Sequence, residues 1–90
     1  MKFQGAVIEE QGIKFAVVIV KEDVFGSKTK PKQTVAALRD IFPDIPIILM
    51  AQDSEGNPTY YGRTDIVRFL TELDLKEIPW KEFTLDMEVG

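Results

Sequence analysis

Two segments of strand length are apolar almost without interruption, and they constrain the fold more than any other feature of the chain. Residues 13–20 are Ile-Lys-Phe-Ala-Val-Val-Ile-Val, and residues 45–51 are Ile-Pro-Ile-Ile-Leu-Met-Ala. A strand with one face in water alternates apolar and polar residues, so a continuous apolar run predicts a strand that is covered on both faces. We therefore expect both segments in the middle of a β-sheet.

The chain between these two strands has the pattern of a helix. Thr29 is a suitable N-terminal cap, Pro31 is tolerated in a first turn, and Pro43 ends the helix because the residue before a proline avoids helical angles. The apolar residues recur at helical spacing and form one stripe: Val35, Leu38 and Ile41 or Phe42. A helix that joins two central strands predicts a right-handed crossover and a parallel strand pair.

A hairpin is expected on each side of this unit. Residues 3–8 form a strand that pairs with residues 13–20 through a turn at residues 9–12. Residues 59–61 return as an antiparallel strand after a turn at residues 53–57. The sheet is therefore expected to be mixed.

A second helix and a last strand complete the pattern. Thr64 caps this helix, and its buried stripe is Ile66, Phe69, Leu70 and Leu73. Beyond Trp80 the apolar residues alternate strictly with polar ones: Phe83, Leu85, Met87 and Val89. This alternation is typical of a half-exposed strand, or of a tail that becomes a strand against a partner.

The element order β-β-α-β-β-α-β predicts a single α/β (α+β) domain over residues 1–90. We expect a two-layer sandwich in which a mixed sheet of four to five strands has both helices on one face. Because the central strands are apolar on both sides, the other face also needs cover. Trp80 and the C-terminal segment would provide it, or a second copy of the protein.

The composition excludes several kinds of chemistry. The 90 residues include no cysteine and no histidine, so a disulfide framework, a thiol redox centre, a cysteine nucleophile and a histidine base are all absent. The carboxylate pairs fall in predicted turns or strand ends, without the apolar surroundings that raise a carboxyl pKa for catalysis. We expect no catalytic residues, no metal and no cofactor, and therefore not an enzyme.

The charge and the N-terminal sequence indicate where the protein is located and which macromolecules it does not bind. Residues 1–71 are formally neutral, with nine basic and nine acidic side chains, so residues 72–90 carry the whole net charge of −4. Nucleic acid would repel that end of the chain. The N-terminus lacks the pattern of a signal peptide, and residues 15–20, the longest apolar run, are far short of the about 20 needed to cross a membrane. We expect a cytoplasmic protein that binds neither nucleic acid nor membrane.

One part of the chain resembles a known fold family. Residues 45–50, Gly56, residues 61–62 and residues 65–70 resemble the C-terminal half of thioredoxin and glutaredoxin folds, over about a third of the chain. There an aliphatic residue and a cis proline open a strand, a glycine turn makes a hairpin, and a last helix packs behind it. The family's redox motif should lie near residues 24–27, where this chain has no cysteine, so thiol redox activity is excluded.

The first candidate site is a lysine-rich loop, residues 26–32, that leads directly into a helix. Lys28, Lys30 and Lys32, together with the free N–H groups of a helix N-terminus, would attract an anion such as phosphate. The alternative is a solvated connection whose lysines offset nearby acids.

The second candidate site is the segment that joins the fourth strand to the second helix. Tyr60, Tyr61 and Arg63 are residue types enriched in binding sites, and Gly62 lets a partner approach the backbone. The alternative is that one tyrosine faces the core while Arg63 pairs with a carboxylate such as Asp65. Trp80 is either a lid on the core or an anchor in a dimer contact.

Two functions remain open. The first is a non-catalytic protein-interaction or regulatory module, which would contact a protein partner or a second copy through an edge strand. Residues 79–90 would be that edge strand or a partner-binding tail. The alternative is a small domain that binds an anion or phosphate ligand at the lysine-rich loop.

Overall fold

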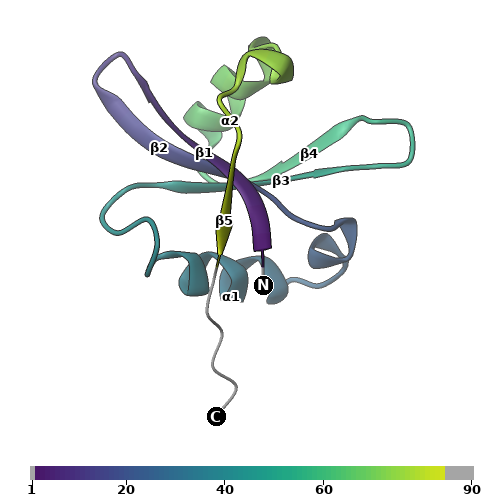
Figure 1. The fold of residues 1–90 in the computed structure, drawn as a ribbon. Helices are drawn as coiled ribbons and strands as arrows, with labels where there is room; N and C mark the ends of the chain where they lie inside the picture. The colour runs from purple at the N-terminus through teal and green to yellow at the C-terminus, as the bar shows by residue number, and fades with distance from the viewer. Residues whose placement is uncertain (1, 85–90) are drawn as a thin grey trace.

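Two parallel strands lie at the centre of a five-stranded mixed sheet, as the apolar runs predict. The computed structural model describes residues 2–84, and its strand order is β4-β3-β2-β1-β5 (Figure 1). The strands are β1 (Lys2–Glu10), β2 (Ile13–Ile19), β3 (Ile47–Gln52), β4 (Pro58–Tyr61) and β5 (Lys81–Thr84). β2 and β3 are parallel, whereas β1–β2, β1–β5 and β3–β4 are antiparallel pairs. The predicted fold class, parallel pair and two hairpins are confirmed.

Two short α-helices lie in the predicted order, but the first ends at Leu38, before the predicted stop at Pro43, and Thr29 makes no side-chain capping hydrogen bond. α1 (Lys30–Leu38) joins β2 to β3, and α2 (Thr64–Glu72) follows β4. Two 3-10 turns, η1 (Glu22–Gly26) and η2 (Leu75–Glu77), precede α1 and β5. In the part of the chain that the structure describes, no helix is long and apolar enough to cross a membrane.

The two helices lie on opposite faces of the sheet, which corrects the expectation that both would lie on one face (Figure 1). Under α1, Leu38 and the following Phe42 pack on a first cluster of sheet residues: Phe3, Ala16, Val18, Ile47 and Leu49. Under α2, Ile66 and Leu70 pack on a second cluster: Ala6, Phe15, Val17, Ile48 and Met50, together with Ile78. Alternate residues of β2 and β3 thus belong to different cores, so each face of these strands requires its own cover.

The C-terminal strand lies at one edge of the sheet. β5 pairs with the beginning of β1, with Lys2 opposite Thr84 and Gly5 opposite Lys81. The predicted alternation continues through Leu85, Met87 and Val89, which lie outside the described residues. Just before β5, Trp80 packs against the second core cluster, and its Nε1 donates a hydrogen bond to the Leu75 carbonyl at 3.1 Å. This position matches the interpretation of Trp80 as a lid on the core.

The turn between β3 and β4 is held by the carboxylate of Asp53. Its Oδ1 accepts hydrogen bonds from the backbone N–H groups of Glu55 and Asn57, each at 2.9 Å. Gly56 has a positive φ of 86°, as this turn requires. The Asn57 backbone bond is the main cause that lowers the pKa of Asp53 below its ordinary value of 3.8.

The lowered pKa predicts how Asp53 contributes to stability at different pH values. The ionised carboxylate favours the folded state above pH 3.8, and this contribution is lost as the pH falls through the folded pKa. We expect wild type to be more stable than Asp53→Asn at neutral pH, with the difference shrinking as the solution is acidified. The urea unfolding midpoints of both proteins, measured from neutral pH down to below pH 3.8, give this stability difference. A difference that stays constant down to the lowest pH would contradict the role of the ionised carboxylate.

Candidate functional site

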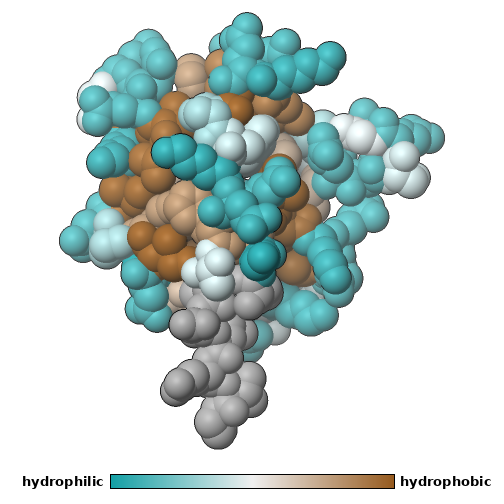
Figure 2. Space-filling view, viewed as in Figure 1, coloured by the Kyte–Doolittle hydropathy of each residue, from teal (hydrophilic) through white to brown (hydrophobic). Residues whose placement is uncertain are grey.

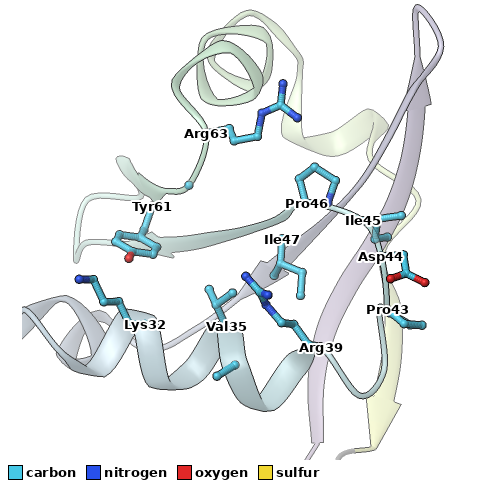
Figure 3. Close-up of a pocket in the computed structure, with 12 residues that line it drawn as sticks. Lys32, Val35, Arg39, Pro43, Asp44, Ile45, Pro46, Ile47, Tyr61 and Arg63 are labelled. Carbon is cyan, nitrogen blue, oxygen red and sulfur yellow. The ribbon is translucent and has the colours of Figure 1, made fainter.

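A cavity of about 760 Å³ lies on the α1 side of the sheet, where β3 begins and β4 ends (Figure 3). Its volume is in the range typical of small-molecule sites, roughly 300–1,000 Å³. Three segments line it: Lys32, Val35, Ala36 and Arg39 of α1 and its end; Pro43, Asp44, Ile45, Pro46 and Ile47 leading into β3; and Tyr61, Gly62 and Arg63 after β4.

Helix geometry explains why these α1 residues face the cavity together. Residues 32, 35, 36 and 39 are spaced i, i+3, i+4 and i+7, which places them on one side of a helix. The opposite wall comes from the sheet, where Leu49 pairs with Tyr61. Because β3 and β4 are antiparallel, residues 62–63 therefore lie beside the start of β3.

The charged side chains around the cavity are mostly cationic. Lys32, Arg39 and Arg63 line it, and Asp44 is the acid in the lining. Arg63 is paired with Asp65: Nη2 donates to Oδ2 at 2.7 Å and Nε donates to Oδ1 at 3.2 Å. These bonds hold the pKa of Asp65 below its ordinary value. The charge of Arg63 is therefore largely offset.

The other two cations are available to a ligand. Among residues 2–84, the ion pairs are Lys2–Glu82 and Arg63–Asp65, so Lys32 and Arg39 have no acidic partner within 4.0 Å. In Figure 3 the Tyr61 hydroxyl is directed toward Lys32, while the Arg63 guanidinium points away from α1. The cavity therefore offers a hydroxyl donor and two cations without an acidic partner in the described part of the chain, beside aliphatic and proline walls.

The structure brings together three of the seven predicted site residues. Lys32, Tyr61 and Arg63 line the same cavity, although they come from two different candidate sites. Lys28 and Lys30 are exposed and are not among its lining residues. The lysine-rich loop as a whole is thus not the cavity wall.

Two more predicted residues lie on the opposite face. Tyr60 and Trp80 both pack against the second core cluster, under α2. Burial of Tyr60 raises the pKa of its hydroxyl. Tyr61 packs against the first cluster, so the adjacent tyrosines are divided between the two faces, as strand alternation predicts.

Sequence reasoning missed Arg39 as a site residue. Its spacing of seven from Lys32 was the available signal, because residues at i and i+7 share a helix face. The spacing alone does not predict a site, because the opposite wall of the cavity comes from the end of β4, which is distant in the sequence.

A second cavity, of about 540 Å³, lies along another side of α1 and is lined by Gln33, Thr34, Ala37 and Leu38 of that helix. Its walls include Val24 of η1, Ala37 of α1 and Val18 of β2, and its charged lining residues are Lys2, Lys21 and Asp23. Here one acid accompanies two lysines, and Lys2 already pairs with Glu82 at 3.8 Å. In the described part of the chain, no three acidic side chains gather closely enough to hold a metal ion.

No protein-family model matches the chain, and no curated protein or solved structure matches it. Within residues 2–84 no peptide bond is cis, so Pro46 lacks the cis bond that the thioredoxin resemblance implies.

Gly62 has a structural reason to be glycine. Its φ of 152° is a conformation that side chains rarely adopt. A Cβ there would collide with Cδ1 of the fully buried Ile48 and approach the Ile47 carbonyl oxygen at 3.3 Å. Gly62 therefore allows β3 of the same chain to approach the backbone closely, whereas the sequence suggested the approach of a partner.

This contact predicts a clear loss of stability in Gly62→Ala. We expect a loss of roughly 2–4 kcal/mol in the free energy of unfolding, because Ile48 must move and the backbone is strained. Gly26→Ala is the matched control, since a Cβ at Gly26 meets nothing within 4 Å and its effect should stay within about 0.5 kcal/mol. Urea unfolding compares the two variants, and equal stability would contradict this packing role.

Proposed function

We propose that the protein binds a small organic anion in the cavity between α1 and the β3–β4 pair. The observation that carries this proposal is the presence of two cations, Lys32 and Arg39, that pair with no acid within residues 2–84, beside apolar walls in a cavity of about 760 Å³. This observation supports anion binding over the protein-interaction module. The anion site that we propose lies on one face of α1, whereas the sequence suggested the lysine-rich loop.

The anionic group of the ligand fits best between Lys32 and Tyr61. An ammonium group and a hydroxyl both donate hydrogen bonds to a carboxylate or phosphate oxygen. Figure 3 shows these two side chains facing each other across the cavity. Arg39 lies seven residues along from Lys32, about 10 Å along a helix axis, so it reaches a different part of the same ligand.

The part of the ligand that lies between these two cations is expected to be apolar. Val35, Ile45 and Ile47 contribute aliphatic surface, and two prolines add to it. Apolar contacts supply binding free energy in proportion to the area removed from water, while the polar groups fix the orientation. An aryl or alkyl phosphate or carboxylate therefore fits the cavity better than inorganic phosphate.

A protein-interaction module remains a second proposal, and a different observation supports it. β5 pairs with β1 on one side, while its other side is the edge of the sheet. Strand edges expose backbone N–H and C=O groups that pair readily with another strand. This edge lies outside the cavity lining, so the two proposals do not exclude each other.

Ligand binding is tested by amide NMR titration with three probes. Phenyl phosphate has both parts of the expected ligand, inorganic phosphate has only the anion, and benzyl alcohol has only the apolar part. We expect phenyl phosphate to bind most tightly and to shift the amides of residues 32–39, Ile45, Ile47 and residues 61–63.

A variant of Lys32 tests whether this cation holds the anion. Lys32→Ala should weaken phenyl phosphate binding roughly 10- to 100-fold, because a hydrogen bond to a charged group is lost. Lys28→Ala and Lys30→Ala are matched controls that remove the same charge outside the cavity, and they should leave the affinity within about threefold. Equal loss in all three variants, or no binding by wild type, would contradict the proposal.

A further inference from the structure

The backbone groups at the outer edge of β5 are identified by the hydrogen-bond alternation of the sheet. β1 and β2 are joined by a two-residue turn, Gln11 and Gly12, which places Glu10 opposite Ile13 as a hydrogen-bonded pair. Counting back along β1, the even-numbered residues bond to β2 and the odd-numbered ones face β5. The bond from the Ala16 N–H to the Pro46 carbonyl agrees, because it shows that even residues of β2 face β3.

The same alternation carries over to β5. Phe3 and Gly5 face this strand, so their partners Phe83 and Lys81 direct their backbone groups toward β1. The N–H and C=O groups of Glu82 and Thr84 therefore point outward, away from the sheet. They are the groups that another strand would bond.

We propose that two copies of the protein pair through antiparallel β5 strands, with the two-fold axis at Phe83. In this register Glu82 lies opposite Thr84 of the partner subunit. The two-fold axis repeats this pair on its other side, and the two residues of each pair exchange two backbone hydrogen bonds. The two five-stranded sheets then become one continuous sheet. This inference rests on the second of the proposed functions and is independent of ligand binding.

Phe83 is the reason to expect a second copy there. Its ring stacks on Phe3 with centroids 5.4 Å apart and meets Phe42 edge-on at 5.1 Å, yet Phe83 itself is only partly buried. Figure 2, viewed with β5 toward the front, shows hydrophobic surface beside this strand. In the proposed register Phe83 faces Phe83 of the partner subunit as a non-hydrogen-bonded pair, the closer of the two pair types. The second ring extends the aromatic cluster across the seam.

The charges of β5 favour this register over others, although residues 72–90 carry the whole net charge of −4. The charged residues of β5 are Lys81 and Glu82, of opposite sign, and Glu82 already pairs with Lys2 at 3.8 Å. The two-fold at Phe83 places Glu82 opposite a threonine hydroxyl and not opposite another carboxylate. Each copy carries a net charge of −4, and at about 0.15 M salt a screening length of about 8 Å weakens the long-range repulsion between copies.

The other edge of the sheet is less suited to pairing. β4 begins with Pro58, which has no backbone N–H to donate to a neighbouring strand. β5 contains no proline within Lys81–Thr84.

Sedimentation equilibrium at 0.15 M salt tests the dimer with a matched pair of variants. Wild type should move from 10.2 kDa toward twice that mass as its concentration rises. Thr84→Pro removes the outward N–H but none of the donors to β1, so it should weaken the dimer at least about tenfold. Thr84→Ala keeps the N–H and should change the dimer constant less than about threefold. A monomer at all concentrations would overturn the proposal, as would a dimer that Thr84→Pro leaves intact.

Cross-linking tests the register and does not depend on whether Thr84→Pro folds. The chain has no cysteine, so Glu82→Cys and Thr84→Cys each introduce a single thiol. An oxidised mixture of the two variants should form the mixed disulfide faster than either variant alone forms its own. Equal rates would overturn the register. Phenyl phosphate titration of Thr84→Pro then separates the two proposals, because ligand binding should survive loss of the dimer.

Discussion

The fold depends on two strands that are buried on both faces. In β2, Ala16 and Val18 belong to the core under α1, while Phe15 and Val17 belong to the core under α2. Burying a valine or phenylalanine side chain contributes roughly 1.5–3 kcal/mol, and these strands bury such side chains on both sides. Neither face can be left to water, so the chain must supply a cover for each. That requirement places one helix above the sheet and one below it.

The position of the cavity follows from this arrangement. The parallel connection between β2 and β3 carries α1 across one face of the sheet, and the chain must then return to the start of β3 through residues 39–46. Asp44 makes part of this return with a positive φ of 64°. Because α1 ends at Leu38, the space beside the return segment is closed from the other side by Tyr61 and not by more helix. A hollow with a cationic helix face on one wall is the result.

Much of the architecture could be predicted from local patterns. The two apolar runs identified the central strands, and the helix between them required a parallel pair. The side of the sheet that each helix covers could not be predicted, because β2 and β3 are equally apolar on both sides. Strand alternation predicted that Tyr60 and Tyr61 would be divided between the faces, but it could not say which would reach a site.

The candidate site was harder to predict because its walls are distant in the sequence. The crossover connection brings Lys32 close to Tyr61. Arg39 is a site residue only because the end of β4 forms the opposite wall of the cavity. Lys28 and Lys30 resemble Lys32 in sequence, yet they lie outside the cavity lining. The cytoplasmic location and the absence of nucleic-acid or membrane binding remain predictions from charge and composition.

The central claim is that Lys32 and the apolar walls beside it hold one organic anion. Isotope-filtered NOE spectroscopy with phenyl phosphate tests it most directly, because it reports which methyl groups lie against the phenyl ring. The account predicts contacts from the ring to the methyl groups of Val35 and Ile47, which line the cavity. Contacts to Val24 and Ala37 in the second cavity, or no contacts at all, would contradict it.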